Sequence, residues 1–330
     1  MTRLLQALAL LLALTPVSAQ QRAPYQPPQH TLPAPLLGTA RPGEAAAYAE
    51  LGLQIERARG ARDLLAEHRR LANALGALQP QRRGQVDAYV VSIALDSDPV
   101  FGREAREAAR VLARRYRAEG RTVTLAGSDG GAPSELPMGS PNSLAAALAR
   151  VAELMDVRED VLVVYATSHG APFGIVYNDG DQGFGAVAPA RLYHLLRELG
   201  VRNRLLFVSA CYSGQFVPML MADDTAIVTA SASDRTSFGC QADNDWTFFG
   251  DALVNRALRK PQPLASAATE AERLIGEWER RGGLEPSNPQ LSIGAGAKRW
   301  LPQLERGLPP ATPPVGRPSV DSLEGVSARR

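Results

Sequence analysis

The chain has 330 residues, of which 45% are hydrophobic, and its 36 basic and 34 acidic residues give a formal net charge of +2. This length accommodates one large domain or two small ones, and the hydrophobic fraction is that of an ordinary globular protein. The balanced charge gives no reason to expect a nucleic-acid partner. Two cysteines allow at most one disulfide, and with four scattered histidines they do not suffice for a usual structural zinc site.

The N-terminus has the pattern of an export signal. Arg3 precedes the apolar run Leu4–Leu14, and small residues ending at Ala19 follow, so cleavage is expected before Gln20. The run is short for a bilayer span, which needs about 20 residues. We therefore expect residues 1–19 to be removed and the mature protein to be exported, to the periplasm or the medium, without stable membrane insertion.

Three further segments flank or precede the main domain. Residues 20–43 are rich in Pro, Gln and Ala and are predicted to be a flexible leader. Residues 44–85 carry leucines amid Ala, Arg and Glu, which predicts a helical N-terminal extension of two helices broken near Gly60. Residues 302–330 are proline-rich and are predicted to be a disordered tail.

Between these segments, residues 86–301 alternate between apolar strands and amphipathic helices. This order predicts βαβ crossovers and one α/β domain with a mostly parallel sheet. Continuously apolar strands indicate a sheet covered on both faces. The predicted strands are VDAYVVSIAL (86–95), TVTLAG (122–127), DVLVVYAT (160–167), RLLFVSA (204–210) and DTAIVTAS (224–231), and the predicted helices are 102–120, 140–155, 188–200, 246–258 and 264–283.

Two predicted strands end in residues that can do chemistry. His169 and Gly170 follow the strand 160–167, and Cys211 follows the strand 204–210. Sites in open α/β sheets form at the carboxyl ends of strands, and successive strands are usually neighbours. Cys211 is therefore a candidate nucleophile with His169 as its proton-transfer partner, because the thiolate is the reactive species. The N–H groups of Gly170 and Cys211 are candidate donors to an oxyanion.

Several alternatives stand beside this pair. Cys211 taken alone is as consistent with a small buried core residue, and after export it could form a disulfide with Cys240, although we interpret Cys240 as a buried bystander. Ser213 lacks the glycine pattern of a serine nucleophile. The turn Tyr177–Gly185 carries Asn and Asp but not the spacing of a calcium loop, so a hairpin or active-site loop is favoured. No metal and no cofactor is expected.

The motifs "TSHG" and "SACYSG", together with "SASDRTSFGCQADNDWTFFGDAL" (231–253), resemble the legumain family of cysteine peptidases. These are the asparaginyl endopeptidases of peptidase family C13, in the caspase-like clan. The resemblance covers about residues 86–258. It implies a caspase-like α/β/α sandwich with a mostly parallel sheet of about six strands, a His169–Cys211 dyad, and an oxyanion hole formed by the Gly170 and Cys211 amides.

The resemblance also implies a pocket for the residue before the scissile bond. It places Arg103, Ser209, Ser237 and Asp251 in that pocket, with Arg103 and Asp251 facing each other so that they hydrogen-bond an asparagine amide. Two positions depart from the family pattern: Ser209 replaces an acidic residue two before the cysteine, and Glu104 replaces a histidine beside the arginine.

The expected function is that of an exported cysteine endopeptidase, acting on proteins or peptides through an acyl-enzyme and cleaving after Asn or Asp. A transpeptidase would share every catalytic residue and differ in the access of water. A non-catalytic secreted binding module on the same fold is a third hypothesis, and a scaffold whose proline-rich tail binds a partner is a fourth. The sequence does not specify an oligomeric state.

Overall fold

A six-stranded sheet forms the centre of the protein, whose computed structural model describes residues 30–127 and 135–323. The predicted export signal and nearly all of the first half of the leader lie outside these residues. The strand order is β10-β9-β8-β4-β2-β3, and all neighbouring pairs are parallel except β10 with β9. The mostly parallel sheet is therefore confirmed. Its strands are β2 (Ala88–Ala94), β3 (Thr122–Leu125), β4 (Val161–Thr167), β8 (Asn203–Ser209), β9 (Thr225–Thr229) and β10 (Gln290–Ile293).

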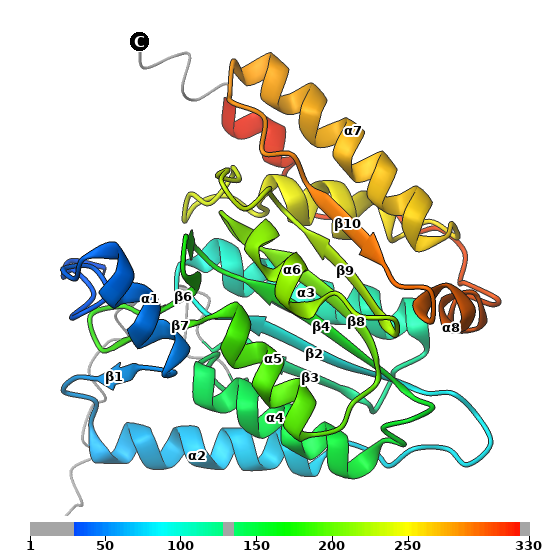
Figure 1. Cartoon of the computed structure of the whole chain (residues 1–330), viewed down its shortest axis with the longest axis horizontal. Coiled ribbons are helices and arrows are strands. Elements are labelled where there is room, and N and C mark those ends of the chain that lie inside the picture. Colours follow the sequence, from blue (N-terminus) through cyan, green and yellow to red (C-terminus); the bar gives the residue numbers. More distant parts are fainter. Residues whose placement is uncertain (1–29, 128–134, 324–330) are drawn as a thin grey trace, which may run out of the picture.

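Helices cover both faces of this sheet, which gives three layers (Figure 1). One face carries α3 (Pro99–Tyr116), the π-helix η2 (Gly250–Ala257), α7 (Leu264–Gly282) and α8 (Ala297–Leu304). The other face carries α2 (Ala61–Gly76), α4 (Pro141–Leu154), α5 (Pro189–Glu198) and the short α6 (Phe216–Leu220). The predicted α/β/α sandwich is confirmed.

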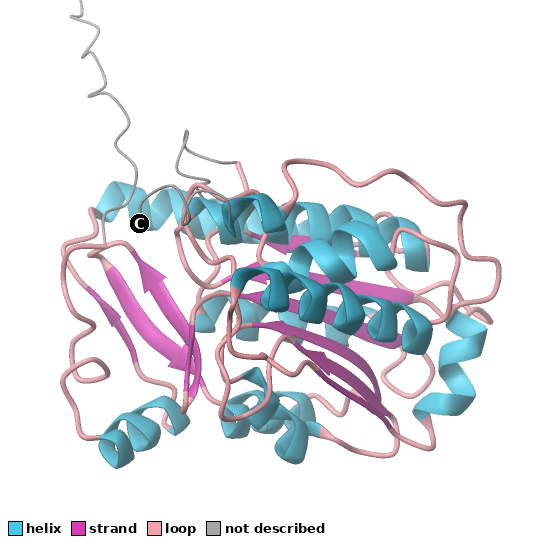
Figure 2. Ribbon diagram, turned by 90° about the horizontal axis from the view of Figure 1, so that it is seen from above, coloured by secondary structure: helices cyan, strands magenta, loops and turns pink. Residues whose placement is uncertain are grey.

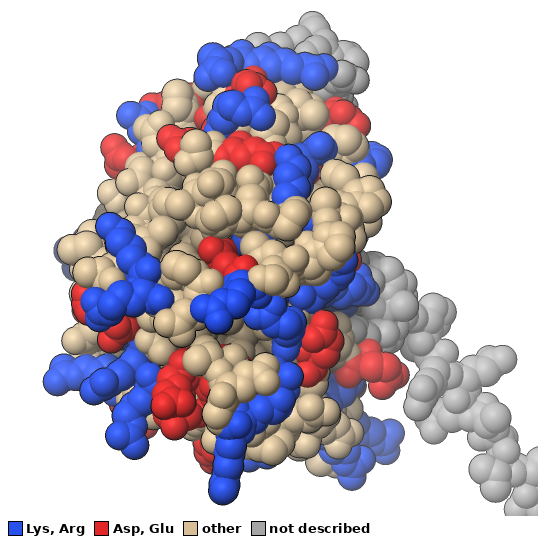
Figure 3. Space-filling view, turned by 90° about the vertical axis from the view of Figure 1, so that its right-hand side faces the viewer, with Lys and Arg blue, Asp and Glu red and all other residues tan. Residues whose placement is uncertain are grey.

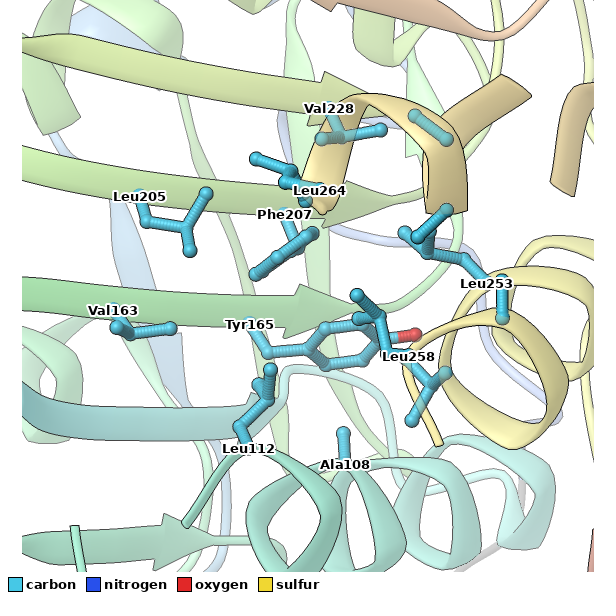
Figure 4. Packing of buried hydrophobic residues seen from close by; sticks show 14 of the residues in the cluster. Ala108, Leu112, Val163, Tyr165, Leu205, Phe207, Val228, Leu253, Leu258 and Leu264 are labelled. Atoms are coloured by element: carbon cyan, nitrogen blue, oxygen red, sulfur yellow. The ribbon is translucent and has the colours of Figure 1, made fainter. Parts of the chain in front are cut away.

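The strands divide their side chains between two hydrophobic cores. In β4, Val163 and Tyr165 enter one core and Leu162 and Val164 the other, because successive side chains of a strand point to opposite faces. Figure 4 shows Tyr165 lying between the sheet and the helical layer that covers it. Both faces of the strands are thus buried, and the strand ends that follow them are held in place.

A second, smaller sheet lies beside the main one (Figure 2). The turn 177–185 is a hairpin, one of the two structures we favoured there, formed by β6 and β7. The prediction for residues 44–85 was only partly right, because a strand separates the two helices and pairs with β7. A three-residue strand is too short to show a period of two. These elements are α1 (Pro42–Glu50), β1 (Gln54–Glu56), β5 (Gly170–Ala171), β6 (Gly174–Asp179) and β7 (Gly183–Val187).

The C-terminal segment packs on the protein, so the predicted disorder is wrong for residues 305–323. The indole N–H of Trp246 donates to the carbonyl of Val315 over 2.9 Å. Ser319 is buried and donates to the carboxylate of Asp251 from its backbone N–H (2.8 Å) and its hydroxyl (3.0 Å). A proline-rich chain is stiff and extended, so it loses little conformational entropy when it is held this way.

The surface carries both signs of charge. Figure 3 shows basic and acidic side chains interspersed over one face of the molecule. Of the helices within the described ranges, none combines the length and the apolar character needed to cross a bilayer.

Candidate active site

Strand register brings His169 and Cys211 to the same edge of the sheet. Thr167 of β4 pairs with Ser209 of β8, and the N–H of Ser168 donates to the carbonyl of Ser209 over 3.2 Å. His169 and Cys211 each lie two residues beyond this pair. Both follow the carboxyl ends of adjacent parallel strands, as the sequence predicted.

Gly170 lies directly against the backbone of Cys211. A Cβ atom at this position would come within 2.0 Å of the Cys211 carbonyl oxygen and 2.9 Å of its amide nitrogen. Only glycine permits this approach. The two proposed oxyanion donors are therefore neighbours.

Hydrogen bonds surround the Cys211 sulfur. The N–H of Ser237 points at Sγ over 3.3 Å, and the Ser237 hydroxyl lies 3.6 Å from it. Donation from the Cys240 thiol, bonds from Ser237 and the charge of His169 together lower the pKa of Cys211 to about 5, against the opposing effect of burial. Among the predicted pocket residues, Ser237 thus contacts the Cys211 sulfur.

Cys240 packs against the small hydrophobic cluster that contains Val100 and Phe101, and its thiol lies near enough to Cys211 to influence its pKa. Both cysteines are free thiols in the structure. The neighbouring Cys211 thiol and burial raise the pKa of Cys240 well above the ordinary value, so this thiol stays protonated. No sequence pattern predicts this proximity, because it depends on the path of the loop after Ser237.

The turn after Cys211 has an unusual backbone. Tyr212 has φ = 57°, a left-handed conformation that non-glycine residues rarely adopt. Its N–H donates to the carbonyl of Arg235 over 2.8 Å, and the next residue, Ser213, is buried and bonded to Ser231. These bonds hold the turn that presents the thiol, and they give Ser213 a structural role.

His169 contacts a carboxylate that we did not single out. Its side chain is 43% exposed, and Nε2 lies 3.5 Å from Oδ2 of Asp98. Burial disfavours the charged imidazole, but Asp98, together with the charge of Asp96, raises the pKa of His169 overall. The same contact lowers the pKa of Asp98. The ring also packs edge-on against Phe101, with centroids 5.0 Å apart.

A signal for Asp98 was present in the sequence. Asp98 follows the first predicted strand at its carboxyl end, just as His169 and Cys211 follow theirs, and β2 pairs with β4 in parallel. A short acidic turn after a strand is common, so the position becomes informative only once the strand order is known.

Glu104 links β4 and β8 through hydrogen bonds to its side chain. Its fully buried carboxylate accepts hydrogen bonds at one oxygen from Tyr165 (2.6 Å), Thr167 (2.8 Å) and Ser209 (2.8 Å). The other oxygen accepts from the N–H and the hydroxyl of Thr247, over 2.9 and 2.8 Å. A buried carboxylate with five donors is well satisfied.

The two residues that depart from the family pattern, Glu104 and Ser209, are both part of this network. The acidic group comes from α3, at Glu104, and the residue two before the cysteine, Ser209, supplies a hydroxyl to it. Ser209 is 2% exposed and its hydroxyl is engaged by Glu104 and Thr247. The structure therefore places Ser209 under the site rather than in an open pocket.

Arg103 is engaged by a loop. Its guanidinium donates to the carbonyls of Ala242, over 2.7 Å, and Asn244, and Nε lies 3.6 Å from a carboxylate oxygen of Asp245. These bonds fix the loop that begins at Cys240. Arg103 thus has a structural task that its place in the sequence did not show.

Asp251 anchors the C-terminal segment. Besides Ser319, its fully buried carboxylate accepts from Asn255 over 2.9 Å and pairs with Arg256 over 3.1 Å. Within the described residues no ion pair joins Asp251 to Arg103. The predicted arrangement of these two residues face to face is therefore not formed.

The model of the Peptidase C13 family matches residues 141–291, which include His169, Gly170, Cys211 and Ser237. The match covers a little under half of the chain, and β2 and α3, which lead to Asp98 and Glu104, precede it. It confirms the resemblance to C13 peptidases and supports a cysteine-peptidase type of function on protein or peptide substrates.

Two further comparisons add little. No curated protein matches the chain. Among solved structures, the crystal structure of caspase-1 from Spodoptera frugiperda is similar, with 14% sequence identity over 66% of this chain and 93% of that chain and a TM-score of 0.44.

Proposed function

We propose that the protein is a cysteine endopeptidase in which Cys211 is the nucleophile and His169 the proton donor. The observation that carries this proposal is the β4–β8 register, which puts both side chains beyond the same pair of residues. The lowered pKa of Cys211 and the raised pKa of His169 favour a thiolate beside an imidazolium near neutral pH. That pair is the reactive form of such enzymes.

The thiolate of Cys211 attacks the carbonyl carbon of the scissile peptide bond. The negative charge that develops on the carbonyl oxygen is stabilised by the N–H groups of Gly170 and Cys211. His169 gives its proton to the leaving nitrogen, the C–N bond breaks, and a thioester remains on Cys211. Neutral His169 then takes a proton from water, whose oxygen attacks the thioester and releases the acid and the thiolate.

Asp98 positions the imidazolium in this scheme. A carboxylate beside the ring stabilises its charged form and restricts its rotation. The role is one of orientation, since Asp98 contacts His169 and not the sulfur.

We also propose that the enzyme cleaves after Asn or Asp. This preference rests on the resemblance to legumains, and two residues expected to contribute, Ser209 and Asp251, are enclosed and occupied by other partners. Two predicted pocket residues can still contact the substrate. They are Ser237, which lies beside the sulfur, and Arg103, whose side chain is partly exposed. We also propose that residues 1–19 direct the protein out of the cytoplasm.

A panel of fluorogenic peptides that differ only before the scissile bond tests the activity. The purified protein is assayed under reducing conditions beside the variants C211A and H169A. The matched control is H194A, which changes an exposed histidine of α5. We expect cleavage by the parent and by H194A, and a loss of at least about a thousandfold in C211A and H169A. Equal cleavage by C211A would exclude the proposed nucleophile.

Product analysis with added amines separates hydrolysis from transpeptidation. Hydrolysis gives the free acid at every amine concentration, whereas a transpeptidase gives a new amide in proportion to the amine.

A further inference from the structure

The segment that begins at His30 lies against Asp98, the carboxylate that contacts His169. The imidazole Nε2 of His30 is 2.9 Å from the hydroxyl of Ser97 and 3.6 Å from Oδ1 of Asp96. Its Nδ1 is 3.7 Å from Oδ1 of Asp98. The ring therefore sits over the turn that connects β2 to α3, beside the carboxylate that holds His169.

Hydrogen bonds fix this segment in place. The backbone N–H groups of Thr31 and Leu32 both donate to one oxygen of Asp181, each over 2.8 Å. Ser97, which contacts His30, in turn accepts from the N–H of Gly180 over 3.0 Å. The β6–β7 hairpin thus holds the leader next to the active site.

His30, Asp96 and Asp98 have the composition and spacing of a metal site. One ligand atom from each lies within 4.8 Å of the other two. One imidazole nitrogen with two carboxylates suits zinc and the neighbouring divalent ions. A tetrahedral ion with bonds of about 2.1 Å separates its ligands by about 3.4 Å, which is close to the 3.6 Å between His30 Nε2 and Asp96 Oδ1. Asp98 contacts the other ring nitrogen, Nδ1, so the binding of one ion by all three residues requires a small movement of the Asp98 carboxylate or the ring.

An independent observation at Asp96 points to a cation. This side chain is only 4% exposed, and its Oδ2 is enclosed without a hydrogen-bond partner in the described part of the chain. A buried carboxylate oxygen without a partner is costly unless a donor or a cation meets it.

We propose that His30, Asp96 and Asp98 bind one divalent transition-metal ion, such as zinc, and that this ion inhibits the peptidase. The inhibition follows from the shared carboxylate, because Asp98 also contacts His169 over 3.5 Å. A cation bound to Asp98 neutralises the negative charge that stabilises the imidazolium of His169. It also repels that imidazolium directly. The inhibitory half rests on the proposed function, whereas the binding half does not.

Zinc titration by calorimetry tests the binding half. The titration uses the variant C211A, which removes the reactive thiolate as a competing ligand, in protein that retains residue 30 and carries no affinity tag. We expect one ion per chain. The variants H30A and D96N, made in the same background, should each weaken binding by about tenfold or more.

The matched control is H68A, in the same background, because His68 is an exposed histidine of α2. It should leave the affinity unchanged. Near-ultraviolet circular dichroism confirms that each variant is folded, and H30A, at an exposed residue, remains informative if D96N does not fold. No zinc binding by the parent variant, or equal binding by H30A, would overturn the site.

Inhibition is measured on protein that keeps Cys211. Zinc also binds thiolates directly, so the decisive quantity is the ratio between variants. We expect the zinc concentration for half inhibition to rise at least about fivefold in H30A and to stay constant in H68A. An equal value in H30A would overturn the inhibitory role. Absence of any peptidase activity would overturn the proposed function and leave the calorimetric result standing.

Discussion

Thr167 and Ser209 lie opposite each other on β4 and β8, and both donate their hydroxyl hydrogens to the same oxygen of Glu104, each over 2.8 Å. His169 and Cys211 follow them by two residues. The relative position of the two catalytic side chains therefore depends on a strand register that a buried carboxylate reinforces. Residues held by packed strands and saturated hydrogen bonds keep the geometry that catalysis needs.

Replacing Glu104 should destabilise the fold. In E104A the donors from Tyr165, Thr167, Ser209 and Thr247 lose their acceptor, and each buried unpaired group costs about 1–3 kcal/mol. We expect the free energy of unfolding in urea to fall by at least about 3 kcal/mol. E119A, at an exposed glutamate, is the control and should change it by less than about 0.5 kcal/mol. An unchanged urea midpoint in E104A would contradict the network.

Replacing Asp98 should slow turnover without weakening substrate binding. The carboxylate acts through its contact with His169, so kcat should fall while KM stays within about twofold. D98N keeps an acceptor for the ring N–H and should lose less than D98A, for which we expect about a hundredfold loss. Steady-state kinetics in buffer with a chelator give both parameters. A change confined to KM would argue that Asp98 contacts substrate.

The thiol of Cys211 should ionise near pH 5. Because its pKa is lowered, the thiolate is present above about pH 5 and lost below it. Alkylation by iodoacetamide, followed on the Cys211 peptide by mass spectrometry, should have its midpoint there. In C240A the thiolate loses a donor, so the midpoint should move to higher pH. A parent midpoint near the ordinary value of about 8.5 would contradict this environment.

Removing the C-terminal segment should destabilise the protein. A chain that ends at Gly307 lacks the Val315 carbonyl that accepts from Trp246, and it lacks Ser319, which donates to buried Asp251. We expect the melting temperature to fall by several degrees, about 2–4 °C for each kcal/mol lost. A chain that ends at Leu323 keeps these bonds and should melt like the parent. Equal melting of both truncations would show that the segment contributes nothing.

The sequence was a good guide to the centre of the molecule. Long apolar strands that alternate with amphipathic helices have few arrangements open to them, and successive parallel strands tend to be neighbours. These two constraints place His169 and Cys211 together before any coordinates are known. The same reasoning cannot find Asp98, whose value as a partner depends on β2 lying next to β4.

The pocket was predicted less well because its residues act through partners far away in the chain. Asp251 is held by Ser319 and Arg103 by the loop at Ala242, and neither contact has a local signal. The hydrogen bond from Ser209 to Glu104 likewise cannot be predicted until α3 is placed on the sheet. Composition alone predicts a disordered tail. The hydrogen bonds that hold residues 305–323 are made with the folded domain, and the composition of the tail carries no information about them.

Trapping the acyl-enzyme tests the central claim, that Cys211 forms a thioester with the substrate, most directly. The protein is mixed with an excess of a peptide ester that it cleaves, quenched in acid within a single turnover, digested and examined by mass spectrometry. We predict that the acyl group is found on the peptide that contains Cys211, and that it is missing from C211A. Turnover of the ester with no acyl group on Cys211, or equal turnover by C211A, would contradict the claim.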